Sequence, residues 1–167
     1  AISESSKVMI GAGFVLMFTV PLVRILINSG VNGSGFDSMP IAMANFVAQS
    51  VGDIYPFFAP MVGALGAFIA GSNTVSNMML AQFQFGVADA LGISTAFMVA
   101  LQAVGAAAGN MIAIHNVVAA SATVGLLDQE GETLRKTVIP TIYYCVVVGI
   151  IGVIGMYFLG VTDPLMK

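Results

Sequence analysis

Charged side chains are scarce in this sequence. Asp, Glu, Lys and Arg make up 8% of the 167 residues, whereas hydrophobic residues make up 58%. A soluble domain carries roughly a quarter charged residues, so the composition excludes a soluble globular protein. The net charge of -3 is small and spread over the loops. It therefore predicts neither a basic patch for nucleic acid nor a polybasic lipid-binding run.

Cysteine and histidine each occur once, as Cys145 and His115. A single cysteine excludes a disulfide framework, and the apolar surroundings of Cys145 favour a small packing side chain. The sequence contains no metal-ligand spacing, no readable Ser/His/Asp set and no phosphate-binding loop. We therefore expect neither an enzyme nor a protein with a cofactor or a metal.

Two polar segments interrupt the apolar sequence. Residues 71–77 read Gly-Ser-Asn-Thr-Val-Ser-Asn, and residues 109–116 read Gly-Asn-Met-Ile-Ala-Ile-His-Asn. Irregular backbone persists at membrane depth only where protein or a water-filled cavity surrounds it, because an unpaired amide or carbonyl is costly in lipid. The first segment separates two arms that are each short for a crossing, and the second lies in a run too long for one straight crossing. Together they predict a ligand site in the membrane.

The apolar runs predict an all-α integral membrane protein. The chain begins at Ala1 without a methionine, and we expect it to be part of a longer protein. The predicted elements are a transmembrane helix over residues 8–28, a short helix over 40–52, a re-entrant hairpin over 55–87, a broken helix over 93–127 and a transmembrane helix over 137–160. In the hairpin, Asn73, Asn77 and Gln84 fall on one face of the second arm.

The charged stretch over residues 128–136 indicates the orientation. It must lie in water, and Arg135 and Lys136 mark it as cytoplasmic by the positive-inside rule. Counting crossings backwards places Lys7 inside, as the rule requires. The C-terminus, Lys167, is then expected outside.

Four strings carry a resemblance to a known family: Gly-Ser-Asn-Thr-Val-Ser-Asn-Met-Met at residues 71–79, Ala-Leu-Gln-Ala-Val-Gly at 100–105, Gly-Asn-Met-Ile at 109–112 and His-Asn-Val-Val at 115–118. They closely resemble the C-terminal part of the bacterial L-lactate permease family. The resemblance implies the ion-transporter superfamily fold, in which an inverted repeat supplies two re-entrant hairpins and two broken helices. This chain would be one such repeat.

The resemblance also implies a function. We expect proton-coupled symport of L-lactate, and of other 2-hydroxy monocarboxylates such as glycolate, across the bacterial plasma (inner) membrane. The expected partners are L-lactate or glycolate, protons, membrane lipid and the remaining N-terminal repeat of the permease, with a homodimer as a further candidate. Residues 72–74 are similar to the Ser-Asn-Thr hairpin tip of sodium-coupled dicarboxylate carriers, but residues 109–116 lack the Thr-Pro-Pro pattern of those carriers, which weighs against sodium coupling. The alternatives are a sodium-coupled organic-anion carrier and a non-transporting structural module of a membrane complex.

The residues at the predicted breaks suit a monocarboxylate. Helix N-termini present unpaired N–H groups and a partial positive charge, and side-chain amides can donate to a carboxylate and accept from a 2-hydroxyl. The predicted substrate-binding residues are Ser72, Asn73, Thr74, Asn77, Asn110 and Asn116. The alternative is that these side chains only join packed helices.

His115 has two interpretations. Histidine is suited to carrying a proton, because its ordinary pKa is about 6.5. A neutral histidine could equally fix the unwound backbone. The sequence does not separate a proton-coupling role from this structural one.

Overall fold

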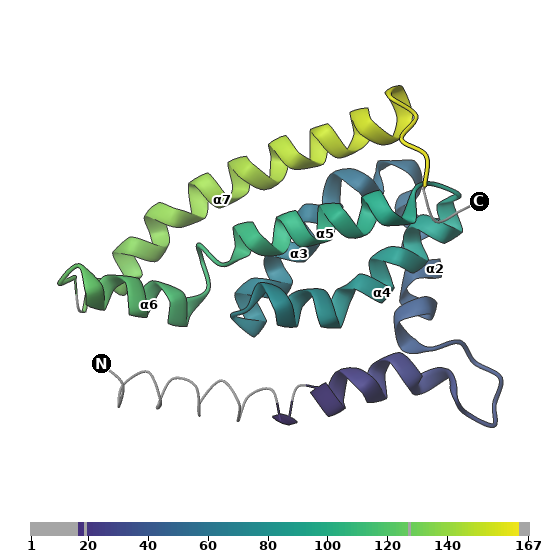
Figure 1. The fold of residues 1–167 in the computed structure, drawn as a ribbon, viewed down its shortest axis with the longest axis horizontal. Helices are drawn as coiled ribbons and strands as arrows, with labels where there is room; N and C mark the ends of the chain where they lie inside the picture. Colours follow the sequence, from purple (N-terminus) through teal and green to yellow (C-terminus); the bar gives the residue numbers. More distant parts are fainter. Residues whose placement is uncertain (1–16, 19, 127, 164–167) are drawn as a thin grey trace. The chain divides into compact units, whose positions relative to one another are not determined.

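The computed structural model describes residues 17, 18, 20–126 and 128–163, and every regular element in these ranges is helical (Figure 1). This confirms the predicted all-α class. The chain divides into two compact units, residues 1–39 and 40–167. The re-entrant and inverted-repeat details of the predicted fold stay predictions.

The first unit contains a helix over residues 20–27 that tightens into a 3-10 turn, η1, Asn28–Gly30. Ser29 Oγ donates to the carbonyl of Leu26 at 2.7 Å and accepts from the backbone N–H of Met39 at 2.7 Å. These bonds close the glycine-rich loop that follows the helix. Residues 8–16 and 19 of the predicted 8–28 helix lie outside the described residues.

The second unit begins at Pro40, the second residue of a long apolar segment. Helix α2 (Met39–Val51), the 3-10 turn η2 (Gly52–Ile54) and α3 (Tyr55–Ala70) follow one another with little interruption. Pro56 lies in the first turn of α3, where its missing N–H costs nothing. By length and composition, Met39–Ala70 is one of two segments in the described residues that could cross a membrane.

A helix break lies inside the first polar segment. Gly71 ends α3 in the left-handed conformation (φ 68°), and its N–H donates to the carbonyl of Ala67 at 2.6 Å. Ser72 then caps α4 (Asn73–Leu91), because its Oγ accepts from the N–H of Val75 at 3.4 Å. Glycine and serine are the residues that such an end and such a start favour.

A second break lies inside the second polar segment. Helix α5 (Thr95–Gly109) is followed by a short turn and by α6 (Ile114–Thr123), and the two helices are bent by 45°. Taken together they pass the length and composition test for a third membrane-crossing segment.

The last helix, α7 (Glu130–Val153), continues as a π-helical turn, η3 (Ile154–Phe158). It begins seven residues before the predicted boundary at residue 137. Glu130 and Glu132 lie in its first turn, where acidic side chains complement the helix dipole. Glu132 also pairs with Lys136 at 2.8 Å with a spacing of four residues. These contacts let the charged stretch form a helix in water.

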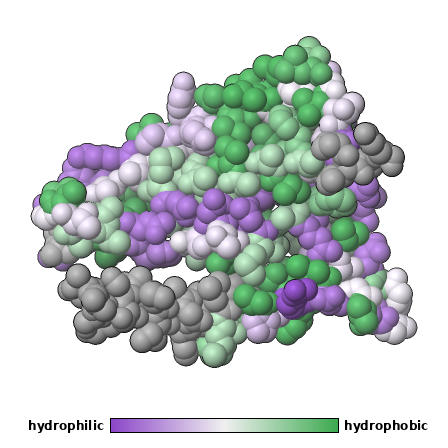
Figure 2. Space-filling view, viewed as in Figure 1, coloured by the Kyte–Doolittle hydropathy of each residue, from purple (hydrophilic) through white to green (hydrophobic). Residues whose placement is uncertain are grey.

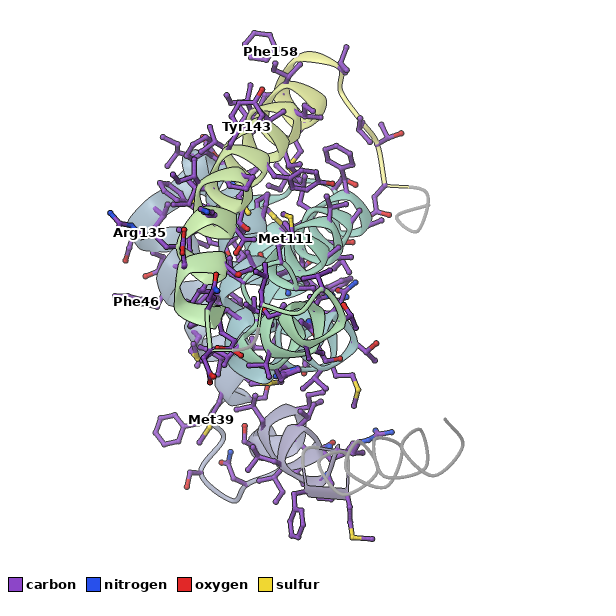
Figure 3. All side chains as sticks on the ribbon, turned by 90° about the vertical axis from the view of Figure 1, so that its left-hand side faces the viewer. Met39, Phe46, Met111, Arg135, Tyr143 and Phe158 are labelled. Atoms are coloured by element: carbon purple, nitrogen blue, oxygen red, sulfur yellow. The ribbon has the colours of Figure 1, made fainter. Side chains whose placement is uncertain are left out.

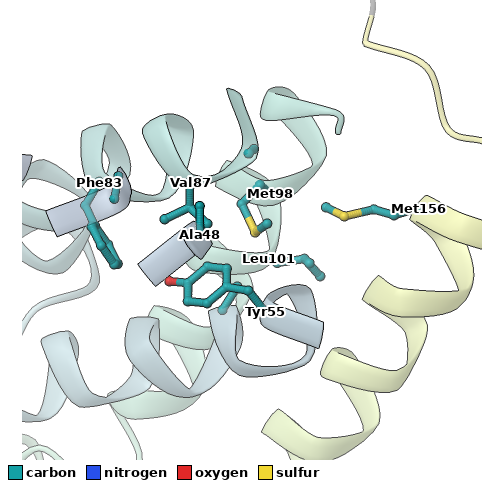
Figure 4. Close-up of a cluster of buried hydrophobic side chains, with 10 residues drawn as sticks. Ala48, Tyr55, Phe83, Val87, Met98, Leu101 and Met156 are labelled. Atoms are coloured by element: carbon teal, nitrogen blue, oxygen red, sulfur yellow. The ribbon is translucent and has the colours of Figure 1, made fainter. Parts of the chain in front are cut away.

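Helix α3 packs against α4, α5 and α7, and small residues set the spacing. A Cβ atom built on Gly105 of α5 would lie 2.0 Å from the carbonyl oxygen of Pro60, and one on Gly149 of α7 would lie 2.3 Å from that of Phe57. Backbones therefore approach directly at both contacts. The main buried apolar cluster includes Ala48, Tyr55, Phe83, Val87, Met98, Leu101 and Met156 (Figure 4).

The outer surface of α7 remains apolar. Hydrophobic side chains cover its C-terminal half at the top of Figure 2, and Tyr143 and Phe158 project from it beyond Arg135 (Figure 3). Tyr143 is 72% exposed and Phe158 is 80% exposed. Such a surface suits contact with lipid or with further membrane helices.

Candidate substrate site at two helix breaks

The two helix breaks meet at Gly71 and His115. His115 Nε2 lies 2.6 Å from the carbonyl oxygen of Gly71, across 44 residues of sequence. Because a carbonyl can only accept, Nε2 carries the hydrogen in this contact. A Cβ atom at Gly71 would lie 1.3 Å from Cε1 of the imidazole, so only glycine fits here.

Each break presents the start of a helix. At α4, Ser72 satisfies the N–H of Val75, and the carbonyl of Ser72 accepts from Ser76 at 2.9 Å. The first-turn N–H groups of Asn73 and Thr74 have no helical partner, as in any helix start. The α6 start at Ile114 follows Ala113, which makes no side-chain cap. Two helix N-termini, each with a partial positive charge, therefore lie close to the Gly71–His115 contact.

The asparagines form two pairs. Asn77 Nδ2 donates to Asn73 Oδ1 at 2.8 Å, and Asn116 Nδ2 donates to the backbone carbonyl of Asn110 at 3.2 Å. Among the described residues, no hydrogen bond links one pair to the other. Within the described part of the chain, Asn77 Oδ1 and Asn110 Oδ1 are buried atoms with no hydrogen-bond partner. Each is an acceptor that lacks a donor.

The predicted site residues differ from one another in their structural roles and in their exposure. Ser72 acts as the cap of α4, and Thr74 is exposed. His115 is the residue that joins the segments, because its ring reaches Gly71. Neither polar segment contains an acidic side chain. Their electrostatic character therefore comes from the helix starts and from His115.

A group of buried, hydrogen-bonded polar side chains next to the breaks was not predicted from the sequence. Gln84, Gln102 and Ser76 are completely buried and hydrogen-bonded to one another, with Tyr55 at one end. Gln84 was expected on a polar face with Asn73 and Asn77, but it points into the helix packing. The available signal was the presence of glutamine in the middle of two largely apolar helices, at positions 82 and 84 in α4 and at position 102 in α5.

The helical structure and its polar interruptions define the class of protein. Two described segments, and a third if the bent pair is counted, are long and apolar enough to cross a bilayer. No group of three potential metal-binding side chains occurs in the part of the chain that the structure describes. The chain is an all-helical integral membrane protein in whose described residues one pair of helices bends by 45°.

Comparison with known proteins identifies the family. The L-lactate permease family model matches residues 1–159, and the chain belongs to that family. It is 42% identical over 125 residues to a putative L-lactate permease of Haemophilus influenzae (75% of this chain, 23% of that protein). It is 34% identical over 129 residues to the L-lactate permease of Escherichia coli K12 (77% and 22%) and 32% identical over 124 residues to the glycolate permease GlcA of the same strain (74% and 22%).

These relatives are much longer than this chain, which spans 23% and 22% of the first two that it matches. The family resemblance predicted from the four sequence strings is confirmed. No solved structure matches the chain.

Proposed function

We propose that this chain is part of a permease that carries L-lactate and glycolate across the bacterial plasma membrane, as a transporter rather than an enzyme. The relatives named as L-lactate and glycolate permeases support this substrate class. The chain spans little more than a fifth of their length, so the transport activity belongs to the whole permease. The single observation that carries the proposed site is the contact of the two helix breaks at Gly71 and His115.

The substrate carboxylate is held between the helix starts of α4 and α6. Each helix N-terminus carries a partial charge of about +0.5 and unpaired N–H donors. Ser72, Asn73 and Thr74 supply the α4 side, and Asn116 lies in the first turn of α6. With no acidic side chain in either segment, nothing local repels an anion.

The substrate 2-hydroxyl donates to an asparagine oxygen. Asn77 Oδ1 and Asn110 Oδ1 are buried acceptors without a partner among the residues that the structure describes, and leaving such a group unpaired costs about 1–3 kcal/mol. A 2-hydroxy acid supplies the missing donor, whereas a 2-oxo or unsubstituted acid does not. The site therefore selects against acids that lack the hydroxyl.

His115 couples a proton to the anion. Its Nε2–H holds the carbonyl of Gly71, and its other ring nitrogen, Nδ1, can accept a proton. A protonated imidazole beside two helix starts adds positive charge, which a bound carboxylate offsets. Proton and carboxylate thus favour each other's binding, as symport requires. His115 can also fix the unwound backbone while it carries a proton, because Nε2 holds the carbonyl of Gly71 and Nδ1 accepts the proton.

Uptake of labelled L-lactate by proteoliposomes containing the full-length permease tests the function. We expect an inward proton gradient to drive uptake and an inward sodium gradient to have no effect. Sodium-driven uptake would instead support the organic-anion carrier alternative, with residues 72–74 as its cation site. Absence of uptake under both gradients would favour a structural module.

Substitution of single asparagines tests the site. We expect Asn73→Ala, Asn110→Ala and Asn116→Ala to reduce uptake at normal membrane abundance, since each removes a proposed substrate contact. Gln82→Ala is the matched control, because Gln82 Oε1 is also a buried acceptor without a partner but lies in α4 away from its first turn. Loss of the folded protein without loss of uptake per molecule would support helix packing instead.

The orientation is part of the proposal. With Arg135 and Lys136 on the cytoplasmic side, the C-terminus lies outside. Labelling of a cysteine introduced at Gly131, from one side of sealed vesicles at a time, tests this orientation.

A further inference from the structure

Four hydrogen bonds form one buried chain across α3, α4 and α5. Tyr55 Oη donates to Gln84 Oε1 at 2.8 Å, and Gln84 Nε2 donates to Gln102 Oε1 at 2.9 Å. Gln102 Nε2 then donates to Ser76 Oγ at 3.2 Å, and Ser76 Oγ donates to the carbonyl of Gly63 at 2.9 Å. Gln84, Gln102 and Ser76 are 0% exposed, and Tyr55 is 3% exposed.

The carbonyl of Gly63, the last acceptor, fixes which atom donates and which accepts in every hydrogen bond of this buried chain. The Gly63 carbonyl can only accept, so Ser76 must donate to it and use its own oxygen to accept from Gln102. This turns the Gln102 oxygen toward the Gln84 amide nitrogen, and the Gln84 oxygen is left for Tyr55. Each amide therefore has one orientation that satisfies its neighbours.

Such a chain fixes geometry more than it adds stability. Apolar side chains of similar volume hold membrane helices together about as well, because the polar groups of separated helices also find partners within the membrane and an interhelical hydrogen bond adds only about 0.6–2 kcal/mol. A fully satisfied polar chain, in contrast, favours one relative arrangement of the helices that carry it. Here α3 and α5 end at the two breaks, and α4 starts at the first of them.

The chain of buried hydrogen bonds extends to the start of α4, which belongs to the proposed carboxylate site. Ser76 lies one turn inside α4, between Asn73 and Asn77, and it anchors the α4 start to α3 through Gly63. Gln102 lies seven residues before the end of α5 at Gly109, about 10 Å along the helix. We infer that Ser76 and Gln102 are positioning residues that set the α4 N–H donors relative to the second break. This inference rests on the proposed function.

Transport kinetics of the full-length permease test the inference. In Ser76→Ala and Gln102→Met, we expect the KM to rise about tenfold, with little change in the maximal rate per folded transporter. The factor should be the same for L-lactate and glycolate, because the misplaced donors bind the carboxylate that both share. Thr141→Val is the matched control: it removes a hydroxyl that is 3% exposed and bonds only within α7, to Thr137. Its KM should equal that of the wild type.

Unchanged KM values in both variants, with only a lower melting temperature, would overturn the inference. The buried hydrogen bonds would then serve helix packing alone. If Ser76→Ala does not accumulate in the membrane, Gln102→Met and Ser76→Cys, which retains a weak donor, carry the test. A wild-type permease that takes up neither substrate would overturn the proposed function, and the inference with it. Uptake by the wild type with unchanged KM in the variants would overturn the inference alone.

Discussion

At the residue scale, Gly71 and Gly92 form a natural comparison. Each ends a helix in the left-handed conformation, with φ of 68° and 67°. Their surroundings differ, because a Cβ atom at Gly71 would overlap the ring of His115, whereas no atom of the described residues lies within 4 Å of one at Gly92. A substitution at Gly92 therefore measures only the strain of a left-handed backbone. A substitution at Gly71 causes the same strain and also displaces the ring of His115.

We expect Gly92→Ala to cost about 1 kcal/mol of stability, the usual strain of a left-handed L-residue, and to keep L-lactate uptake. Gly71→Ala should cost more and reduce uptake, because the His115 ring must leave the Gly71 carbonyl. The double variant Gly71→Ala/His115→Ala should recover part of the added loss, since the ring is gone. Melting temperatures of the purified full-length permease measure these costs. Equal losses in the two single glycine variants would contradict the His115 contact.

At the scale of the elements, the segment after α7 is tied to the start of α5. Asp163 Oδ2 accepts from the backbone N–H of Thr95 at 2.9 Å and of Ala96 at 3.1 Å, and also from the Thr95 hydroxyl. A carboxylate at a helix N-terminus is stabilised by the unpaired donors and by the dipole. Residues 68 positions apart thereby complete one helix cap.

Asp163→Ala should destabilise the permease by about 1–2 kcal/mol, because α5 loses a carboxylate cap. Asp89→Ala is the matched control: Asp89 is an exposed carboxylate near the C-terminal end of α4, where the dipole disfavours negative charge. It should leave stability unchanged or slightly raised. Thermal unfolding of the two variants checks this, and an equal effect would argue against the cap.

Glycines inside helices should respond according to their neighbours. Gly105→Ala must push α5 away from α3, because its Cβ would lie 2.0 Å from the Pro60 oxygen. We expect a loss of about 1–3 kcal/mol, as in other overpacked contacts. Gly131→Ala in the first turn of α7 meets no atom of the described part of the chain within 4 Å and should stabilise by about 0.5–1 kcal/mol through helix propensity. A gain at both positions in a melting experiment would contradict the close α3–α5 contact.

How far the sequence predicts these elements depends on the range of the interactions. The helix break at Gly71 could be predicted, since glycine and a following serine cap are local signals. The sequence predicts the start of the last transmembrane helix at residue 137, after a charged stretch in water, whereas α7 starts at Glu130, where Glu132 and Lys136 pair with the four-residue spacing that stabilises a helix. The all-helical class followed from composition and run length alone.

The candidate site depends on contacts that no local pattern encodes. His115 and Gly71 are 44 residues apart, and Gln84 and Gln102 are 18 apart. Sequence periodicity indicates which side chains share a helix face, but the partner of that face follows from how the helices pack. The sequence therefore shows which positions carry polar side chains, but it does not predict which of these side chains contact one another.

At the scale of the whole molecule, the apolar surface of the second unit exceeds what its own packing covers. On α7, Ile139, Ile142, Ile150 and Ile151 are between 47% and 72% exposed, and they lie on a helix that could cross the membrane. Lipid or other helices of the permease must cover these side chains. The relatives are long enough to supply such helices, because this chain spans only 22–23% of the first ones that it matches.

We therefore expect residues 1–167 alone not to accumulate L-lactate in sealed vesicles, whereas the full-length permease does. Alternating access requires a second body against which the site can rock, and the predicted partner repeat would supply it. Circular dichroism of the reconstituted segment should still show a high helix content, which separates loss of transport from loss of folding. Gradient-driven accumulation of L-lactate by the folded segment would contradict this expectation. In that case a second copy of the segment would have to provide the missing half of the site.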